Sequence, residues 1–400
     1  MSSNKQILSL LCNKHRLLYN CNHPMVTTHC NYKKHSTKVT ANPKVDWNQA
    51  VTEAEKVVGH PTSFLNPRWL LNDEIANVAV HLQKLVGSNH PLITTAKSLF
   101  NNENSNMQTW GLIVLLLSKA ASQTDQFNAE EDARAGVLHR QKELAEITEM
   151  IRIGHLVHRG LVNFCKKNHR LEPAELNDMT FGNKIALLSG DYLLGTSCMK
   201  LACIKNHSLL ELMSCALKDL SESAFIGRRD SQENPLPAIP PEDRTNYAVN
   251  EWTHQNYLGS GSFLAKSCKG TLILAGHDEF MQEQAHEFGK HLALAWQANL
   301  DLVPFIAQDR NTPFNLNCAP VMYHIEYDPS ILMEIDKGIE TVENVNFGNV
   351  FDIVIRGPGV ELTKELQQKH SQKAIDILTS TFKESEARTA LTNIITSIGF

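Results

Sequence analysis

Residues 181–194 read FGNKIALLSGDYLL, and this stretch decides the fold class that the sequence predicts. Its apolar residues recur at spacings of three and four, the pattern of one helix face. The recurring positions are Phe181, Ile185, Leu188 and Tyr192. Glycine costs a helix about 1 kcal/mol relative to alanine, so glycines inside a long apolar helix indicate a close approach by a neighbour. The glycines concerned are Gly182, Gly190 and Gly195.

The rest of the chain also favours helices. Residues 146–163 read EITEMIRIGHLVHRGLVN, a second long apolar segment. No β-hairpin pattern and no alternating strand stands out before Asn344. Other helices are predicted at residues 47–58, 68–86, 91–100, 107–121, 196–205, 208–225, 252–276, 288–305 and 361–382. The expected fold class is therefore all-α.

The first 45 residues differ in charge from the remainder. They hold seven basic residues and no Asp or Glu, and apolar residues between positions 7 and 18 can form one amphipathic face. This composition predicts a mitochondrial transit peptide, with a disordered basic tail as the alternative. Residues 46–400 are expected to form one helical domain. Within it, residues 227–244 are expected to form a surface loop, because their NPLPAIPP run cannot be helical.

Composition excludes several function classes. With 42% hydrophobic and 20% charged residues, the chain has the composition of a soluble globular protein. Outside the first 45 residues, 31 basic residues face 43 acidic ones, which argues against nucleic-acid binding. The nine cysteines include no CxxC pair, so neither a zinc module nor a disulfide framework is expected.

The stretch at 181–194 resembles a signature of the trans-polyprenyl diphosphate synthases, Gly-Asn-Lys-x-Ala-x-Leu-x-Gly-Asp-x-Leu-Leu. The matching residues are Gly182, Asn183, Lys184, Ala186, Leu188, Gly190, Asp191, Leu193 and Leu194. The resemblance covers about residues 47–398. It implies an isoprenoid synthase-type bundle of ten or more helices around a central cavity.

The first acidic motif of that family is lost. Leu156 and His158 match the lead of the motif, but its three aspartate positions hold Arg159, Gly160 and Asn163. In the family these carboxylates share a helix face and hold Mg²⁺ ions that neutralise a diphosphate leaving group. A unit positive charge about 5 Å from a divalent cation costs about 6–7 kcal/mol at an effective dielectric of about 20. The resemblance therefore implies that no family-type metal site forms on this helix.

The second acidic motif is degraded as well. FGKHLALAWQANLDLVPF, residues 288–305, resembles its surroundings, but the aspartate positions hold Leu300, Asp301 and Pro304. Proline at the last position is expected to end or kink the helix. The remaining carboxylate, Asp301, is expected to be solvated or to cap a helix rather than to bind metal.

Three positions where the family binds diphosphate with cations have also changed. Ser88 and His90 stand in the VGSNHP segment where the family has Lys and Arg, and Gly259 with Ser260 replaces a Lys-Thr pair. Losing these cations removes charge-assisted hydrogen bonds to a diphosphate. Four histidines near the two motifs could form a zinc site, but this alternative is disfavoured because His158 matches a family position that needs no transition metal. They are His155, His158, His286 and His291.

Within the family, the chain resembles the subunits of hetero-oligomeric decaprenyl and solanesyl diphosphate synthases that have lost both acidic motifs. That resemblance implies a non-catalytic subunit, without a cofactor of its own, paired with a catalytic subunit that binds Mg²⁺. It also implies a role in making the ubiquinone side chain in the mitochondrial matrix. A self-sufficient prenyltransferase with a rearranged diphosphate site and an unrelated helical scaffold are the alternatives.

The family pairs subunits through helices beside the active site, so the 181–194 stretch is the candidate interface. Its candidate residues are Gly182, Asn183, Lys184, Leu188, Gly190 and Asp191. The two charged members, Lys184 and Asp191, are expected to pair with each other or with neighbours, because buried charges persist when paired.

Overall fold

The computed structural model describes residues 46–58, 110–122, 136–161, 173–307, 310 and 312–399. These residues form more than ten α-helices and two strands of two residues each, so the all-α prediction is confirmed. The helices before the strands are α2 (Trp47–Val58), α6 (Trp110–Ala121), α7 (His139–His158), α8 (Pro173–Cys203) and α9 (His207–Glu222). Those after them are α10 (Tyr247–Asn256), α11 (Ser262–Leu274), α12 (Glu279–Ile306), α13 (Ala319–Tyr327), α14 (Leu332–Ile335), α15 (Phe347–Arg356), α16 (Gly359–Thr381) and α17 (Glu386–Ser397). The predicted helices at 68–86 and 91–100 and the predicted transit peptide lie outside the described residues.

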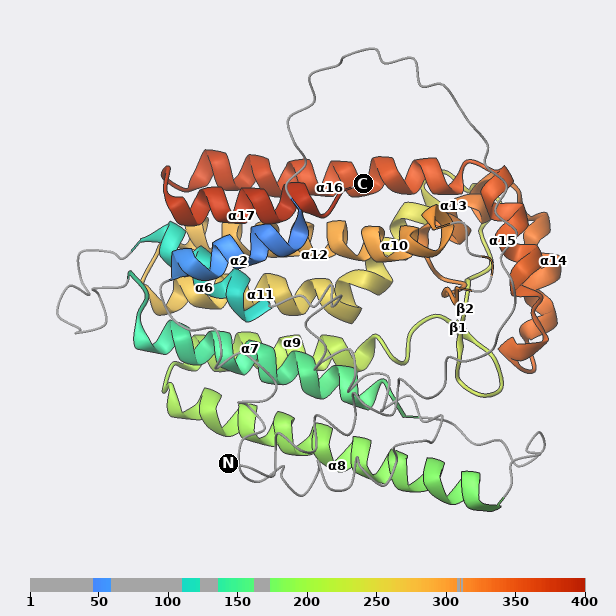
Figure 1. Ribbon diagram of the computed structural model, residues 1–400, viewed down its shortest axis with the longest axis horizontal. Coiled ribbons are helices and arrows are strands. Elements are labelled where there is room, and N and C mark those ends of the chain that lie inside the picture. The colour runs from blue at the N-terminus through green and yellow to red at the C-terminus, as the bar shows by residue number, and fades with distance from the viewer. Residues whose placement is uncertain are drawn as a thin grey trace, which may run out of the picture.

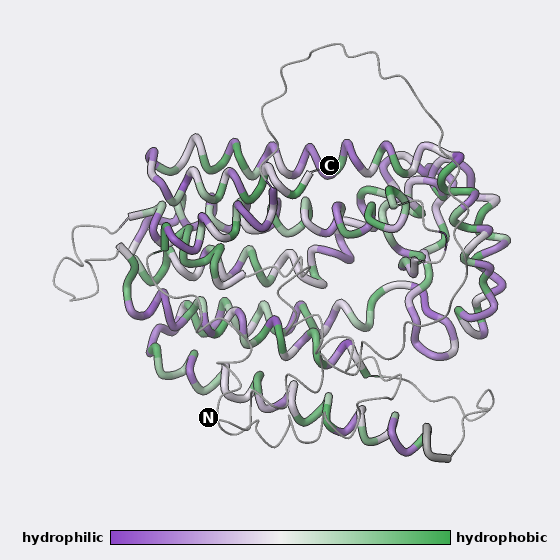
Figure 2. Tube along the Cα trace, viewed as in Figure 1, coloured by the Kyte–Doolittle hydropathy of each residue, from purple (hydrophilic) through white to green (hydrophobic). Residues whose placement is uncertain are grey.

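The long helices lie side by side in layers (Figure 1). Helix α8 forms one edge of the bundle, α16 and α17 form the opposite edge, and α6, α11 and α12 lie between them. Helix α6 is apolar all round and nearly every residue in it is buried, as expected of a helix at the centre of a bundle. Along α16, hydrophilic and hydrophobic residues alternate, as expected of a helix that covers the core with one face (Figure 2).

Helices α7 and α8 approach each other closely at glycines. A Cβ atom built on Gly190 would lie 2.2 Å from ring atoms of His158, and one built on Gly154 would lie 3.3 Å from the carbonyl oxygen of Gly190. The expected close approach is thus confirmed at Gly190. At Gly195 it is wrong, because a Cβ there would meet none of the described residues within 4 Å. Helix α8 also runs unbroken to Cys203, where the sequence predicted a new helix at residue 196.

The proline-rich stretch, predicted as a surface loop, contains a small β-hairpin that its sequence pattern does not predict. Strand β1 (Arg228–Arg229) pairs antiparallel with β2 (Pro235–Leu236). Between them, the carboxylate of Asp230 accepts hydrogen bonds from the backbone N–H groups of Asn234 and Val342, at 2.7 and 2.8 Å. Burial alone would raise the pKa of Asp230, but its hydrogen bonds hold the pKa below its usual value. Two-residue strands are too short to show the alternation on which strand prediction depends.

The predicted helix at 252–276 is interrupted. A π-helical turn, η5 (Tyr257–Gly261), joins α10 to α11. Helix α12 passes through Pro304 and ends two residues later at Ile306, as the proline predicted. Within the described residues, no helix is both long enough and apolar enough to cross a membrane.

Candidate functional site

The first motif lies at the C-terminal end of α7. The helix ends at His158, Arg159 is its C-cap residue, and Gly160 follows in a turn. Asn163, the third motif position, lies outside the described residues. The Arg159 side chain is exposed and Gly160 is buried. Neither residue offers a carboxylate, so the described part of this motif cannot hold Mg²⁺ as the family motif does.

Basic side chains, and no carboxylate of α7, lie in the last turn of α7 and at its cap. His155, His158 and Arg159 gather in the last turn of α7 and at its cap. Burial, together with the nearby charges of Arg159 and His158, lowers the pKa of His155 to about 4. Basic groups at a helix C-terminus complement the helix dipole. Of the motif positions where the family gathers negative charge, Arg159 carries a positive charge here and Gly160 carries none.

His158 packs into the groove that Gly190 leaves open. Its Nε2 atom lies 3.2 Å from the carbonyl oxygen of Leu187 and 3.3 Å from Oδ1 of Asp191. The expected pairing of Asp191 with a neighbour is thus found with His158. Lys184 is exposed, and no ion pair is formed by it within the part of the chain that the structure describes. The two charges do not pair with each other inside this chain.

The last carboxylate of the second motif, Asp301, is already engaged. Its Oδ2 atom accepts hydrogen bonds from the indole N–H of Trp252 at 2.8 Å and from the backbone N–H of Ala319 at 2.9 Å. Its Oδ1 atom accepts one from the Gln297 amide at 2.8 Å. Ala319 is the first residue of α13, so Asp301 joins α10 and α12 to the N-terminus of α13, where a negative charge is favoured.

Burial raises the pKa of Asp301 to about 6, even though all three hydrogen bonds act to lower it. The other two positions of the second motif are apolar: Leu300 is exposed and Pro304 is buried. A group of three carboxylates does not exist here, and the single one present serves packing. The residues of both motifs therefore do not fit a Mg²⁺ cluster.

Two substitutions at Asp301 distinguish a structural role of its carboxylate from a metal-binding role. We expect Asp301→Ala to lower the free energy of unfolding by about 3–5 kcal/mol, because it leaves the N–H groups of Trp252 and Ala319 buried without acceptors. Asp301→Asn should cost less than about 1 kcal/mol, because its oxygen can serve both donors while the Gln297 amide rotates to accept from its nitrogen. Denaturant titration of both variants measures the difference. Equal losses of unfolding free energy in the two variants would contradict the structural role of Asp301.

The lost Lys-Thr position lies in the π-helical turn. Among the described residues, a Cβ on Gly259 would meet only Ser223, at 3.9 Å. The nearby ammonium group of Lys266 forms an ion pair with Asp219, whose carboxylate also accepts from the Ser262 hydroxyl. This cation is neutralised by a carboxylate within the chain. Ser88 and His90 lie outside the described residues.

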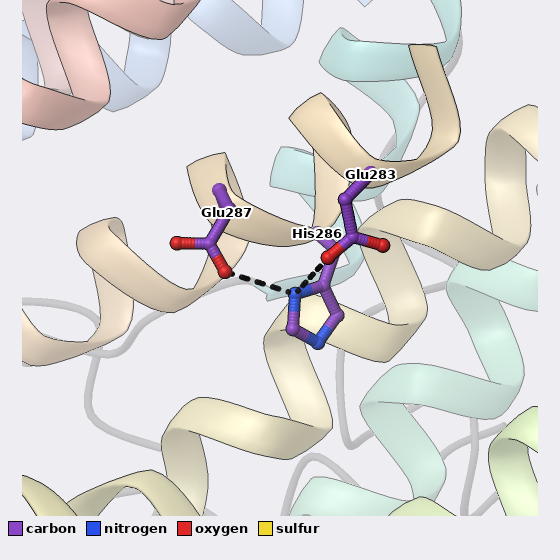
Figure 3. Close-up of side chains that lie close together, drawn as sticks. All are labelled: Glu283, His286 and Glu287. Atoms are coloured by element: carbon purple, nitrogen blue, oxygen red, sulfur yellow. Dashed lines mark ion pairs between the residues drawn. The ribbon is translucent and has the colours of Figure 1, made fainter. Parts of the chain in front are cut away.

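His286, near the second motif, lies among charged side chains of α12. His286 Nδ1 lies 3.6 Å from Glu283 and 3.4 Å from Glu287, and the three side chains converge on one side of α12 (Figure 3). Each carboxylate is also paired with a lysine, Glu283 with Lys269 at 2.8 Å and Glu287 with Lys290 at 3.1 Å. Burial lowers the pKa of His286 despite the carboxylates beside it. This group is an ion-pair cluster.

His291 pairs with a histidine of another helix. Its Nδ1 atom lies 2.8 Å from Nδ1 of His370 on α16, so one ring donates and the other accepts. Burial lowers the pKa of both side chains, to about 4 for His291 and about 3 for His370. The pair is therefore neutral near pH 7, and it joins α12 to α16.

Helix α8 presents apolar residues to solvent. Leu188 is 54% exposed, Tyr192 is 42% exposed and Met199 is 60% exposed, and all lie on one face at helical spacing. The opposite face packs on α7, which is the principal neighbour of α8 among the described helices. These exposed apolar side chains make the outer face of α8 a candidate contact surface.

Apolar side chains fill the bundle beside α12. A crevice of about 20 Å³, lined by residues that include Trp47, Trp110 and Trp296, has room for about one water molecule. Two of the tryptophans, Trp47 and Trp296, lie with ring centroids 4.6 Å apart. The crevice is too small to admit a prenyl chain.

Comparison with known proteins agrees with this description. Residues 108–313 match the family described as Polyprenyl synthetase. The chain is 42% identical to the "All trans-polyprenyl-diphosphate synthase PDSS2" of Mus musculus, over 88% of this chain and 87% of that protein. It is 27% identical to the "Probable hexaprenyl pyrophosphate synthase, mitochondrial" of Neurospora crassa, over 86% of this chain and 83% of that protein.

Solved structures share the fold. A polyprenyl synthase from Caulobacter crescentus, complexed with calcium and isoprenyl diphosphate, superposes with a TM-score of 0.60 at 15% identity, over 90% of this chain and 98% of that chain. A decaprenyl diphosphate synthase from Rhodobacter capsulatus superposes with a TM-score of 0.55 at 14% identity, over 88% of this chain and 97% of that chain.

Proposed function

The chain belongs to the polyprenyl synthetase family, and we propose that it is the non-catalytic subunit of a hetero-oligomeric trans-polyprenyl diphosphate synthase. One observation carries this proposal: the single motif carboxylate in the described residues, Asp301, is held by three hydrogen-bond donors at a helix N-terminus. The first motif carries Arg159 and Gly160 in place of acids. Without these metal ligands the chain cannot carry out the reaction by itself. Its retained fold can still pack against a catalytic subunit, so the chain acts through a partner.

The partner is a catalytic subunit of the same family with intact acidic motifs. That subunit binds Mg²⁺, ionises an allylic diphosphate and joins the cation to isopentenyl diphosphate. The printed names of the relatives support this class of substrate, since they are trans-polyprenyl, hexaprenyl and solanesyl diphosphate synthases. The product is the long prenyl tail of ubiquinone, of decaprenyl or solanesyl type.

The exposed face of α8 is the surface that contacts the partner. Leu188, Tyr192 and Met199 bury apolar area when a second helix covers them, which stabilises a complex by about 25 cal/mol for each Å² removed from water. Gly182, Asn183 and Gly190 act from behind this face, because they lie on its buried or half-buried sides. This face offers packing area without requiring any catalytic group.

The chain acts in mitochondria, in the matrix. Its first 45 residues have the composition of a transit peptide, and relatives from Neurospora crassa, Oryza sativa and Saccharomyces cerevisiae have names that include "mitochondrial". A reporter fused to residues 1–45 should enter the matrix, and a reporter that stays cytosolic would contradict this location.

Co-expression with the candidate catalytic subunit tests the proposal. The two chains should purify together through an affinity tag on either one. The complex should make long-chain prenyl diphosphate with Mg²⁺, whereas this chain alone should make none. Long-chain product from this chain alone, in a preparation free of host synthase, would overturn the proposal.

A further inference from the structure

Three side chains in one turn of α12 have the spacing of metal ligands. They are Glu283, His286 and Glu287, at positions i, i+3 and i+4, so they share one face of the helix. Their ligand atoms all lie within 4.8 Å of one another, and among the described residues no other three His, Cys, Asp or Glu side chains form such a group. Both carboxylates lie beside the same ring nitrogen (Figure 3).

The distances in this group fit a tetrahedral zinc ion. The Nδ1 atom of His286 lies 3.6 Å from Oε1 of Glu283 and 3.4 Å from Oε1 of Glu287. Two ligand atoms that each lie about 2.05 Å from a zinc ion, at the tetrahedral angle, are about 3.3 Å apart. Small side-chain movements are therefore enough to bring all three atoms to one ion.

The Nδ1 atom of His286 is buried and has no hydrogen-bond partner among the described residues. The other ring nitrogen, Nε2, lies 3.3 Å from the hydroxyl oxygen of Tyr257. When Nε2 carries the proton and donates to that oxygen, Nδ1 presents its lone pair to the two carboxylates. Burial lowers the pKa of His286, so the ring is neutral near pH 7, which is the form that binds metals. A lone pair beside two anionic oxygens is stabilised by a cation between them.

Neighbouring side chains hold the two carboxylates from outside the group. Lys269 of α11 binds Oε2 of Glu283 at 2.8 Å, which leaves Oε1 turned toward the group. Lys290 lies 3.1 Å from both oxygens of Glu287, and Nε2 of His291 lies 3.7 Å from its Oε2. Such outer contacts orient the ligands of metal sites in proteins. The two lysines are also cations, so they weaken the binding of an ion without preventing it.

We infer that Glu283, His286 and Glu287 bind a zinc ion. Imidazole together with carboxylates suits zinc, whereas Mg²⁺ prefers oxygen ligands alone. The Glu283 side chain is 51% exposed, so water can complete the coordination. The site uses only one of the four histidines near the two motifs, and the family resemblance implies no ion here.

The proposed zinc ion is structural. Leu300 of the second motif follows Glu287 by 13 residues, about 20 Å along α12. An ion at this distance takes no part in prenyl transfer. It holds the first turns of α12 beside Tyr257 and the π-helical turn η5. The inference is independent of the proposed function, since it requires no partner subunit.

Equilibrium dialysis of the reduced full-length chain against buffered Zn²⁺ tests the inference by measuring the ions bound per chain. Glu283→Gln and His286→Gln should each shift one binding step to a free Zn²⁺ concentration about tenfold higher or more, because each removes one of three ligands. Glu283→Gln keeps the test valid even if His286→Gln impairs folding, because Glu283 is exposed. Its melting temperature without zinc should match that of the unchanged chain.

Two further variants serve as controls. His139 and Glu143 form a His–Glu pair on α7 at 3.5 Å, and His139→Gln should leave every binding step unchanged. Lys269→Gln should shift the same step as Glu283→Gln in the opposite direction, to free Zn²⁺ about threefold lower or more, because it removes a positive charge beside the site.

Three results would overturn the inference. The first is identical Zn²⁺ binding by the unchanged chain and by Glu283→Gln. The second is an equal shift caused by His139→Gln, which would show unspecific binding by surface histidines. The third is displacement of the ion by about a thousandfold excess of Mg²⁺, because a site with an imidazole ligand selects zinc whereas an acidic patch does not.

Discussion

Replacing Leu188 by arginine is expected to abolish the complex with the catalytic subunit and to lower long-chain prenyl diphosphate synthesis by at least about a hundredfold. Such losses of about 2.7 kcal/mol or more arise when an apolar residue at the centre of an interface becomes an unpaired charge. Leu188 is more than half exposed in the single chain, so the isolated subunit should fold normally. Size-exclusion chromatography and a prenyl transfer assay measure the two effects.

Met333→Arg is the matched control, because Met333 is an exposed apolar residue on α14, a helix at one end of the bundle and outside the α7–α8 pair. Its complex should stay intact. If Leu188→Arg and Met333→Arg behave alike, α8 is not the docking surface.

A substitution at Gly190 should disrupt the complex by a different route, through the stability of this chain. A valine at this position would collide with His158 of the same chain. The free energy of unfolding should fall by about 1–3 kcal/mol, and loss of the complex should follow from disturbed α7–α8 packing. A Gly190→Val chain with unchanged stability and no complex would place Gly190 directly in the interface.

Restoring aspartate at positions 159, 160 and 163 should not give an autonomous enzyme. We expect the triple variant alone to remain at least about a thousandfold below the complex, because electrostatic stabilisation of a diphosphate needs several groups at once. The second motif would still offer Leu300, Pro304 and an engaged Asp301. The prenyl transfer assay with Mg²⁺ is the measurement.

The corresponding aspartates of the catalytic subunit provide the control, since changing them to alanine should remove its turnover. If the triple variant became active alone, the loss of function would be confined to one helix. The conclusion that the second motif and the cation positions have also lost their function would then be wrong.

Sequence patterns predicted most of the long described helices but not the contacts between them. Glycine in a long apolar helix predicted a close approach, and Gly190 has one, whereas Gly195 does not. The pattern could not identify the approaching group, because His158 reaches Gly190 from a different helix. The pattern also could not show that Lys184 and Asp191 do not pair with each other. Pairing depends on which side chains the folded chain places beside each of them.

For Asp301, too, the sequence predicted part of its role and only the folded chain shows the rest. The sequence showed that one carboxylate of the second motif survives and predicted solvation or capping rather than metal binding. The donors from Trp252 and Ala319 come from segments 49 and 18 residues away, so only the folded chain identifies them. The hairpin at 228–236 escaped prediction because its strands hold two residues each.

This chain is expected to contribute no catalytic group of its own. The most direct measurement uses the complex of this chain, unchanged, with a catalytic subunit whose first-motif aspartates are replaced by alanine. The complex should still assemble and should show no prenyl transfer above background with Mg²⁺, allylic diphosphate and isopentenyl diphosphate. Turnover by that complex would show that this chain performs catalysis, and it would contradict the account.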